Sequence, residues 1–296
     1  EGVECAGVAS NSPDKLKRFV EKYNVHVYSS YNEVIGDDSV DCVYIPLPPA
    51  FHYEWAKKAL LAGKHVFLEK PSTTSADDTK ELVGIAGEKG LVVQENYMFQ
   101  FHAQLKEIEN LIASGELGKL RLVRTSFGFP RRAEGDFRYV KELGGGTMMD
   151  NGGYTIKLID MLLGESMRLV SSQLDYDEKT GIDIFGTAEF VNDDGVIAQA
   201  AFGMDCQYQC SLELWGSRGR LTTGRIYTAP DGFKPVALVE TGAGSRNVEL
   251  PSCDAFEESI KMYLRAVEDE RLRESMAHEL VRQAEFVDDV RGMDRK

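Results

Sequence analysis

The first hundred residues alternate short apolar runs with amphipathic runs, and this alternation is the strongest constraint on the fold. Apolar runs of strand length occur at 3–9, 41–47, 64–69 and 91–97. The stretches between them carry helix signals, because Ser12 and Pro13 can begin one helix, and Ser75 can begin another that ends at Gly90. Strands and helices in regular alternation build a parallel sheet covered by helices, so the sequence predicts an α/β fold.

After about Phe99 the pattern changes to several long strands in succession. Residues 182–204 are typical of a β-hairpin, because Asn192 to Gly195 place turn-forming residues between two strand-like runs. Residues 254–289 have apolar positions at helical spacing. This order predicts a mostly antiparallel sheet with helices on one face. We therefore divide the chain into a parallel-sheet domain at 1–98 and an α+β domain at 99–296.

Composition argues against two classes of partner. The 296 residues include 34 Lys+Arg and 48 Asp+Glu, and the formal charge of -14 does not suit nucleic acid or an anionic membrane surface. Apolar runs are too short for a membrane helix and the N-terminus lacks signal-peptide features, so we expect a soluble, cytoplasmic protein.

The five cysteines lack CxxC spacing, which favours buried free thiols, with Cys206 and Cys210 packing on a strand rather than forming a redox pair. The histidines show no metal-ligand spacing, so we assign no metal.

The stretch GKHVFLEKPSTT, from Gly63 to Thr74, ends an apolar run with Glu69 and Lys70, directly before Pro71. Ligands of open parallel sheets bind beyond the carboxyl ends of the strands, which is where Lys70 would lie. A partly desolvated lysine at that place can act as a general acid or base near neutral pH. On these residues alone, a solvated lysine at a strand end is the simpler alternative.

A second stretch, from Glu142 to Glu165, joins three glycines to a predicted helix. If the helix continues through it, Asp150 and Tyr154 share one face, where a carboxylate and a phenol can orient and protonate a sugar oxygen. The alternative is a glycine-rich connection with a half-buried tyrosine. The glycines are not the dinucleotide-binding fingerprint, because no strand and no downstream acid frame them as that motif requires.

Taken together, these stretches resemble the glucose-fructose oxidoreductase, inositol dehydrogenase and rhizopine-catabolism (Gfo/Idh/MocA) family. The family's Glu-Lys-Pro motif appears at 62–71, after a Pro-x-Pro turn at 46–48 and His52. Similar blocks follow in order over nearly the whole chain, at 95–123, 135–154 and 212–223. The blocks GDFRY and GGGTMMDNGGY are most similar to nucleotide-sugar 3-ketoreductases, whereas GELGKLRLV is shared with dihydrodiol and D-xylose dehydrogenases.

The resemblance implies an NAD(P)H-dependent oxidoreductase that reduces a keto group of a sugar, in particular a nucleotide-linked 3-ketohexose. Lys70 matches the family's catalytic lysine, and Asp150 matches the aspartate of its D-x-G-x-H/Y motif. Tyr154 stands where cyclitol dehydrogenases carry a histidine. A phenol has an ordinary pKa of about 10 and is protonated at pH 7, so Tyr154 suits protonation of a developing alkoxide, with assistance from Lys70.

The same resemblance assigns binding residues. We expect cofactor contacts from Pro46, Leu47, His52, Glu69, Lys70 and Asn96. We expect substrate contacts from Arg131, Arg138, Asp150 and Tyr154. Arginine matches phosphate geometry, so Arg138 and the Arg131–Arg132 pair are candidates for a sugar or diphosphate, with solvated surface arginines as the alternative.

The residues after the first strand bear on the choice of cofactor. An acid there would bind the ribose 2′-hydroxyl and repel a 2′-phosphate. This chain instead offers Ser10, Asn11 and Ser12, with Lys15 nearby, so NADP(H) is favoured over NAD(H). Ser12 would also cap the following helix.

Two features depart from the family pattern. The family opens with a strand, a glycine-rich turn and a helix that hold the cofactor pyrophosphate. If residues 3–9 are the second strand, this first unit is missing, as a truncated sequence would explain. Pro49 also replaces the family's usual asparagine.

Other readings of the chain stay open beside the ketoreductase. One is an NADP-dependent dehydrogenase of the D-xylose or trans-dihydrodiol type. Another is a cofactor-deficient relative that senses sugars or acts as a scaffold. The resemblance also implies a homodimer or homotetramer formed through the C-terminal sheet.

Overall fold

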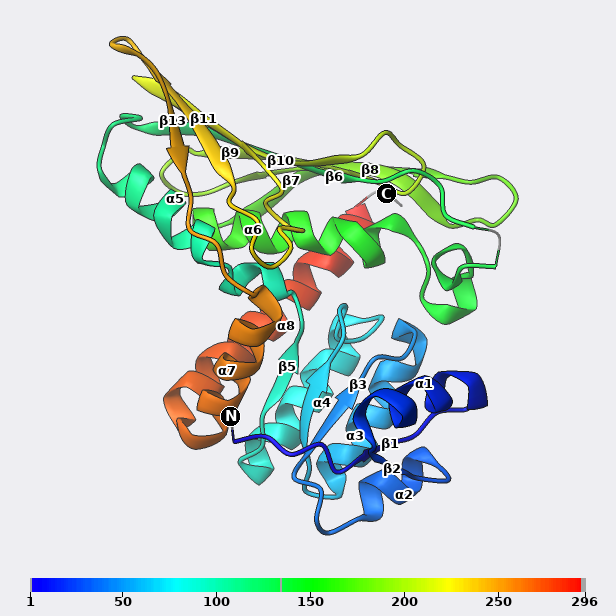
Figure 1. The fold of residues 1–296 in the computed structure, drawn as a ribbon. Helices are drawn as coiled ribbons and strands as arrows, with labels where there is room; N and C mark the ends of the chain where they lie inside the picture. Colours follow the sequence, from blue (N-terminus) through cyan, green and yellow to red (C-terminus); the bar gives the residue numbers. More distant parts are fainter. Residues whose placement is uncertain (1, 134, 294–296) are drawn as a thin grey trace.

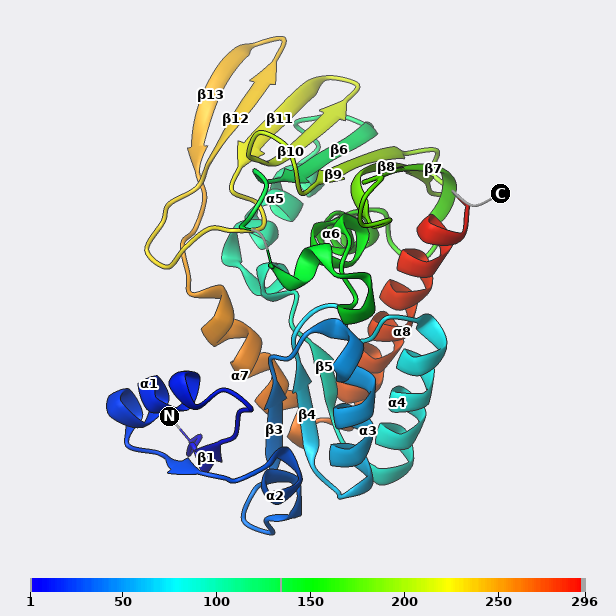
Figure 2. The same cartoon turned by 90° about the vertical axis from the view of Figure 1, so that its right-hand side faces the viewer.

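The computed structural model describes residues 2–133 and 135–293. Figure 1 shows a parallel sheet with its helices, formed by the N-terminal hundred residues, below a wide sheet formed by later residues. Helix α8 (Glu270–Met293) packs on both parts, against α4 (Ala76–Lys89) of the first and β7 (Arg168–Tyr176) of the second (Figure 2). The predicted combination of a parallel sheet and a mostly antiparallel sheet is confirmed.

Three parallel strands form the centre of the N-terminal part. They are β3 (Cys42–Ile45), β4 (His65–Leu68) and β5 (Val93–Glu95), hydrogen-bonded in that order. Their apolar side chains pack with α3 (His52–Leu61) and α4 in a core that buries Ile45, Val66, Leu68, Leu60 and Leu82. As predicted, Ser75 Oγ accepts a hydrogen bond from the N–H of Asp78 at the start of α4, and Gly90 ends the helix with a φ of 67°.

The first two strands form a separate small sheet. β1 (Gly7–Val8) pairs in parallel with β2 (His26–Val27), and the described residues give neither strand a hydrogen-bonded partner in the β3–β5 sheet. The strand predicted at 3–9 is therefore shorter than expected, because Val3 and its neighbours lie exposed rather than in a core. Ser12 occupies the N-cap of α1 (Pro13–Tyr23), but its side chain makes no capping hydrogen bond. A short helix, α2 (Tyr31–Gly36), follows β2.

Eight strands form the C-terminal sheet in the order β13-β12-β11-β10-β6-β9-β8-β7. All neighbours are antiparallel except β6 and β9. The predicted hairpin is confirmed, since β8 and β9 pair across Asn192–Gly195. The bounds not yet given are β6 (Leu120–Gly128), β8 (Asp183–Val191), β9 (Ile197–Gly203), β10 (Gln209–Gly216), β11 (Gly219–Gly224), β12 (Val236–Thr241) and β13 (Gly244–Glu249).

Helices cover one face of this sheet, as predicted. Helices α5 (Ala103–Ala113) and α6 (Gly153–Leu163) lie beneath it in Figure 1, and α6 is almost wholly buried. The core between them includes Ile108, Ile156, Ile159, Phe190 and Phe202. Helix α7 (Ala255–Glu268) packs instead against the N-terminal part, where Tyr263 and Ala266 contact Val92.

Several general expectations can be compared with the described residues. All five cysteines are free, but Cys5 and Cys42 are exposed and only Cys210 is buried, so the expectation that most are buried is wrong. Cys5 lies just before the short strand β1, and Cys42 is the first residue of β3. At these two positions the packing of the described helices and strands leaves both residues exposed. Within residues 2–133 and 135–293, we find neither a cluster of three metal-ligating side chains nor a helix long and apolar enough to cross a membrane.

Candidate active site

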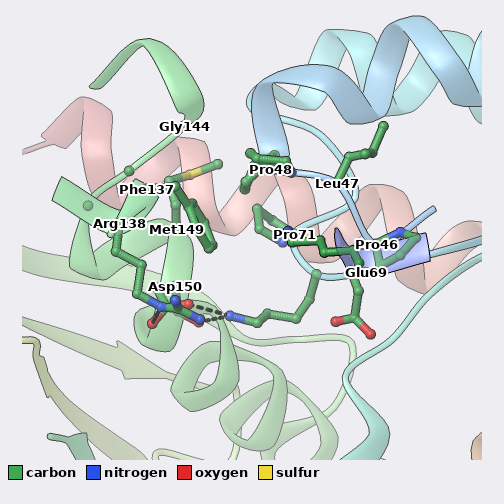
Figure 3. Close-up of a pocket in the computed structure, with 15 residues that line it drawn as sticks. Pro46, Leu47, Pro48, Glu69, Pro71, Phe137, Arg138, Gly144, Met149 and Asp150 are labelled. Atoms are coloured by element: carbon green, nitrogen blue, oxygen red, sulfur yellow. Dashed lines mark hydrogen bonds and ion pairs between the residues drawn. The ribbon is translucent and has the colours of Figure 1, made fainter. Parts of the chain in front are cut away.

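A cavity of about 280 Å³ lies where the carboxyl ends of β3 and β4 meet the segment that leads into α6. Figure 3 shows the two sides of this cavity, with Glu69 and Pro71 on one side and Arg138 and Asp150 on the other. Parallel sheets bind ligands beyond the carboxyl ends of their strands, so the position agrees with the predicted one. The lining residues are Lys15, Pro46, Leu47, Pro48, Pro49, Glu69, Lys70, Pro71, Phe137, Arg138, Gly144, Gly145, Gly146, Met149 and Asp150.

Lys70, Asp150 and Arg138 form a partly buried cluster of charges at this cavity. Lys70 Nζ lies 2.7 Å from Asp150 Oδ1 and donates a second hydrogen bond to the Asp150 carbonyl at 2.6 Å. Arg138 Nε lies 2.9 Å from the other carboxylate oxygen of Asp150. The Lys70 side chain is 13% exposed, which rules out the solvated lysine that the strand end alone suggested.

The charge of Asp150 is fixed by these two cations. Burial raises the pKa of the Asp150 carboxyl, but the ammonium of Lys70 and the guanidinium of Arg138 outweigh burial and hold that pKa below its usual value. Asp150 is therefore a carboxylate at neutral pH. It can orient Lys70 and Arg138, but it is a poor proton donor.

A π-helical turn, η5 (Met148–Gly152), carries Asp150 to this position. Its Asn151 Nδ2 donates hydrogen bonds to the carbonyls of Phe127 at 2.6 Å and Gly203 at 3.0 Å, at the ends of β6 and β9. A π turn sets side chains at a different angle from an α-helix, and such turns occur often at functional sites. The predicted helix through Asp150 is thus present with an altered pitch.

The glycines before this turn allow two segments to approach closely. A Cβ on Gly144, whose φ is 79°, would lie 2.9 Å from Cβ of Pro49, and a Cβ on Gly146 would lie 2.2 Å from Asp183 Oδ1. Asp183 in turn accepts a hydrogen bond from the N–H of Met148 at 2.6 Å. These glycines therefore serve the packing of the loop against the rest of the cavity wall.

Tyr154 lies next to the charged cluster, although it is not among the residues that line the cavity. Lys70 Nζ is 5.2 Å from the centre of the Tyr154 ring, and the ring packs among the aromatic side chains of Tyr97, Phe99 and Phe127. Its hydroxyl contacts Met98 Sδ at 3.8 Å, which is a weak acceptor. Burial, together with the nearby carboxylates of Glu69 and Asp150, raises the pKa of Tyr154 well above its usual value. The phenol is therefore protonated at neutral pH.

Glu69 and Asn96 form a second polar group at the ends of β4 and β5. Glu69 Oε1 accepts hydrogen bonds from Tyr44 Oη at 2.7 Å and Asn96 Nδ2 at 3.0 Å. Asn96 Oδ1 accepts from Ser259 Oγ, and Asn96 is 2% exposed. Glu69 lines the cavity, whereas Asn96 is not among the lining residues and reaches it only through its hydrogen bond to Glu69.

His52 holds the cavity wall from within the protein. Its ring nitrogens lie 2.7 Å from the carbonyl oxygens of Pro71 and Leu47, and the side chain is fully buried. Burial lowers the pKa of His52 more than these carbonyls raise it. His52 therefore ties the turn after β3 to the turn after β4, and its predicted contact with the cofactor stays a prediction.

The arginines separate into two groups. Arg138 lines the cavity, but Arg131 turns to carboxylates at the surface, 3.3 Å from Asp205 and 3.7 Å from Asp177. Arg132 stacks its guanidinium 4.7 Å from the centre of the Phe129 ring. Arg131 is thus paired with carboxylates at the surface, and its predicted contact with the substrate stays a prediction.

The predicted serine–asparagine segment lies directly before α1. Lys15 of α1 lines the cavity, while Ser10, Asn11 and Ser12 are absent from the described lining. Sequence reasoning missed Pro48, Phe137 and Met149 as lining residues. Their signals were weak, since each lies beside a residue that was noted, in the Pro-x-Pro turn, the GDFRY block or the glycine-rich run.

The cavity suits part of a nicotinamide nucleotide. Its volume lies near the lower end of ligand pockets, about 300–1,000 Å³, so it has room for reacting groups but not for a whole dinucleotide. Three cationic and two carboxylate side chains line it, on a chain with a net charge of -14. Cationic groups in a cleft attract an anionic ligand such as a phosphate-bearing cofactor or sugar.

Comparison with known proteins is consistent with this site. A model described as an oxidoreductase family with an NAD-binding Rossmann fold matches residues 1–97, and the Gfo/Idh/MocA C-terminal domain matches residues 105–222. The chain belongs to the Gfo/Idh/MocA oxidoreductase family. The resemblance predicted from the sequence motifs is thus confirmed.

Relatives within this family include sugar reductases. A dTDP-3,4-didehydro-2,6-dideoxy-α-D-glucose 3-reductase of Streptomyces violaceoruber is 37% identical over 97% of this chain and 87% of its own length. The crystal structure of a 3-ketoreductase from Actinomadura kijaniata, in complex with NADP and TDP-benzene, superimposes with a TM-score of 0.94 at 35% identity, covering 98% of this chain and 89% of that chain. A D-xylose 1-dehydrogenase (NADP⁺) of Haloferax volcanii is 30% identical over 90% of this chain and 82% of its own length.

Proposed function

We propose that this protein is an NADPH-dependent ketoreductase that acts on a nucleotide-linked 3-ketohexose. The observation that carries the proposal is the cluster of Lys70, Asp150 and Arg138 beside the protonated phenol of Tyr154, at the carboxyl ends of the parallel strands. The similarity to dTDP-sugar 3-reductases supports the substrate class.

NADPH held by Pro46, Leu47 and Glu69 would supply the hydride that the carbonyl carbon of the substrate accepts, leaving NADP⁺. Tyr154 donates the proton that the carbonyl oxygen needs, and its O–H bond breaks as the alkoxide forms. The weak contact with Met98 leaves this hydroxyl available to a better acceptor. The tyrosine then regains its proton from solvent, so one hydride and one proton are consumed in each turnover.

Lys70 makes the proton transfer feasible. The raised pKa of Tyr154 keeps it protonated but also makes its anion costly. The Lys70 ammonium, 5.2 Å from the ring centre, stabilises negative charge on the phenol and on the substrate oxygen. Asp150 fixes that ammonium through two hydrogen bonds, and Arg138 braces Asp150 from its other side.

The residues that bind the ligands are proposed from their place in the cavity. Pro46, Leu47 and Glu69 would contact the cofactor, with His52 and Asn96 supporting them from behind. Lys15 is the cation placed to meet a 2′-phosphate, which favours NADPH. On the opposite wall, Arg138 and Asp150 would contact the sugar or its diphosphate.

The proposal is tested by incubating the purified protein with NADPH and a dTDP-linked 3-ketosugar, and following the loss of NADPH absorbance. D-Xylose and a trans-dihydrodiol with NADP⁺ serve as competing substrates. We expect turnover of the ketosugar, and a large loss of turnover in Lys70→Ala with little change in NADPH affinity. Faster oxidation of xylose or the diol would favour that dehydrogenase branch, and no binding of NADPH would favour a cofactor-deficient sensor or scaffold.

We further propose a domain boundary, a cellular location and an oligomeric state for this protein. We place the division between the cofactor part and the substrate part of the chain at residues 98 and 99. We place the protein in the cytoplasm, where NADPH and nucleotide sugars would be available to it. We also propose a homodimer or homotetramer formed through the exposed face of the eight-stranded sheet.

A further inference from the structure

A buried acid, Glu95, contacts the turn that carries Lys70 into the cavity. Glu95 is the last residue of β5, and the strand register pairs it with Leu68 of β4. Leu68 precedes Lys70 by two residues. Its Oε1 atom accepts a hydrogen bond from the backbone N–H of Ser72 at 2.6 Å. Ser72 is 2% exposed and Glu95 is 8% exposed, so this hydrogen bond is shielded from water.

Burying a carboxylate at this place costs free energy, because the charged group loses its hydration. A neutral amide could accept the same N–H without the desolvation cost that a charged side chain carries. Burial raises the pKa of Glu95 to about 7, against the opposing effects of Ser72, Lys157 and Lys70. The carboxyl therefore gains or loses its proton within the pH range in which a cytoplasmic enzyme works.

The other ionisable groups around Glu95 include two lysines and two tyrosines. Lys70 follows β4, and Lys157 comes from α6, where it pairs with Glu279 of α8 at 3.2 Å. Tyr97 and Tyr154 both have pKa values raised well above the usual value by burial, so they stay protonated.

Two further groups complete the surroundings of the turn. Asp150 has a lowered pKa, with Lys70 and Arg138 outweighing its burial, and stays ionised. His52, on the carbonyl of Pro71, has a pKa lowered by burial and stays neutral near pH 7.

The hydrogen bond between Glu95 and the Ser72 N–H can influence Lys70, because Ser72 lies two residues after Lys70 in the same turn. A hydrogen bond to an ionised acceptor is roughly twice as strong as one to a neutral acceptor. When Glu95 is ionised, it holds the Ser72 N–H firmly while His52 holds the Pro71 carbonyl. The turn that follows Lys70 is then fixed from both of its sides.

We propose that Glu95 is a positioning residue for Lys70, whose ionised carboxylate holds the Lys70–Ser72 turn so that the ammonium meets Asp150 and Tyr154. This inference rests on the proposed ketoreductase function and adds to it a residue outside the cavity. It predicts that kcat is high above about pH 7 and falls to a lower plateau as Glu95 takes up a proton.

The experiment compares pH profiles of kcat for the wild type and Glu95→Gln. The amide keeps the size and an acceptor atom but cannot ionise, so we expect kcat roughly fivefold below wild type at pH 8 and equal to wild type at pH 5.5. The acid limb near pH 7 should vanish, and NADPH affinity should stay within about twofold. Asp160→Asn is the matched control, because Asp160 is an equally buried acid on α6 that pairs with Arg282 away from the cavity, and it should keep the acid limb.

Hydrogen exchange provides a second measurement that does not depend on turnover. Glu95→Ala removes the acceptor, so the amide of Ser72 should exchange on the order of thirtyfold faster than in the wild type, with an intermediate rate in Glu95→Gln. An unchanged Ser72 exchange rate in Glu95→Ala would overturn the inference even if the protein reduced no ketosugar. In an active enzyme, an acid limb that persists in Glu95→Gln would also overturn it.

Discussion

Tyr154 combines a protonated hydroxyl with weak internal bonding, and this combination is what a proton donor needs. The hydroxyl contacts only a thioether among the hydrogen bonds described, while Lys70 lies over the ring. We predict that Tyr154→Phe lowers kcat by about 10²–10⁴-fold, because proton donation by a positioned side chain contributes about that much. NADPH affinity should change little. Steady-state kinetics and a fluorescence titration with NADPH measure the two quantities.

The control for this prediction is another buried tyrosine. Tyr263→Phe removes a hydroxyl from α7, where Tyr263 is 4% exposed and packs against Phe67 outside the cavity. It should leave kcat near the wild-type value. Equal losses in the two variants would mean that Tyr154 has a structural role and donates no proton.

Lys15 provides a test of cofactor choice at a single residue. It is the cation on α1 that lines the cavity, and the serines and asparagine before α1 carry no negative charge. We predict that Lys15→Glu lowers the preference for NADPH over NADH by on the order of tenfold to a hundredfold, since it replaces a phosphate partner with a repelling charge. The ratio of kcat/KM with the two cofactors measures this preference.

Lys17 supplies the matched control on the same helix. It is 75% exposed and lies 3.8 Å from Glu21, one turn along α1, so its charge faces solvent. Lys17→Glu should therefore leave the NADPH preference unchanged. If both variants shift the preference equally, the effect comes from net charge and not from a phosphate contact.

At the scale of elements, the start of α6 fixes the site by close packing. A Cβ on Gly153 would lie 1.9 Å from Tyr97 Oη, and Gln283 of α8 donates a hydrogen bond to the Gly153 carbonyl at 2.8 Å. We predict that Gly153→Ala destabilises the protein by about 1–3 kcal/mol, because a fully buried methyl group must displace the Tyr97 ring. Denaturant unfolding measures the change in the free energy of unfolding.

An exposed helical glycine gives the opposite expectation. A Cβ on Gly84 of α4 would have no heavy atom within 4 Å, so Gly84→Ala should stabilise the protein by about 0.5–1 kcal/mol through helix propensity. If Gly153→Ala were equally stabilising, the described contact between Tyr97 and α6 would be absent in solution.

The sequence predicted secondary-structure elements better than the tertiary contacts between them. Ser75, Gly90 and the turn at Asn192 act through neighbours a few residues away, and local signals of this kind can be recognised from the chain alone. Lys70 and Asp150 are 80 residues apart, so their ion pair depends on how the two parts of the protein pack. Family motifs indicated each residue separately but not this contact.

The two predicted substrate arginines show the same limit. Arg131 and Arg138 have the same chemistry and lie seven residues apart. Short 3₁₀ turns, η3 (Phe137–Tyr139) and η4 (Lys141–Leu143), bring Arg138 to the cavity, while acidic residues from two distant loops hold Arg131. Which arginine faces the cavity is decided by tertiary structure, and no local pattern reports it.

At the scale of the whole molecule, the outer face of the eight-stranded sheet exposes large apolar side chains. Helices cover the opposite face, but several strands place large apolar side chains in solvent on positions that alternate with buried ones. The exposed fractions are 40% for Phe185, 41% for Ile197, 55% for Trp215 and 48% for Val236. A sheet face that exposes large apolar side chains can serve as a surface for a protein partner.

We predict that a second copy of this chain covers that face, and that Trp215→Asp disrupts the assembly. An aspartate buried by a partner at this position would be desolvated without a counter-charge, which costs several kcal/mol of association free energy. Size-exclusion chromatography with light scattering should find a dimer or tetramer for the wild type and a smaller species for Trp215→Asp. Phe256→Asp is the control, because Phe256 is 52% exposed on α7, outside the sheet, and its replacement should leave the mass unchanged. A monomeric wild type would exclude the sheet as a self-association surface.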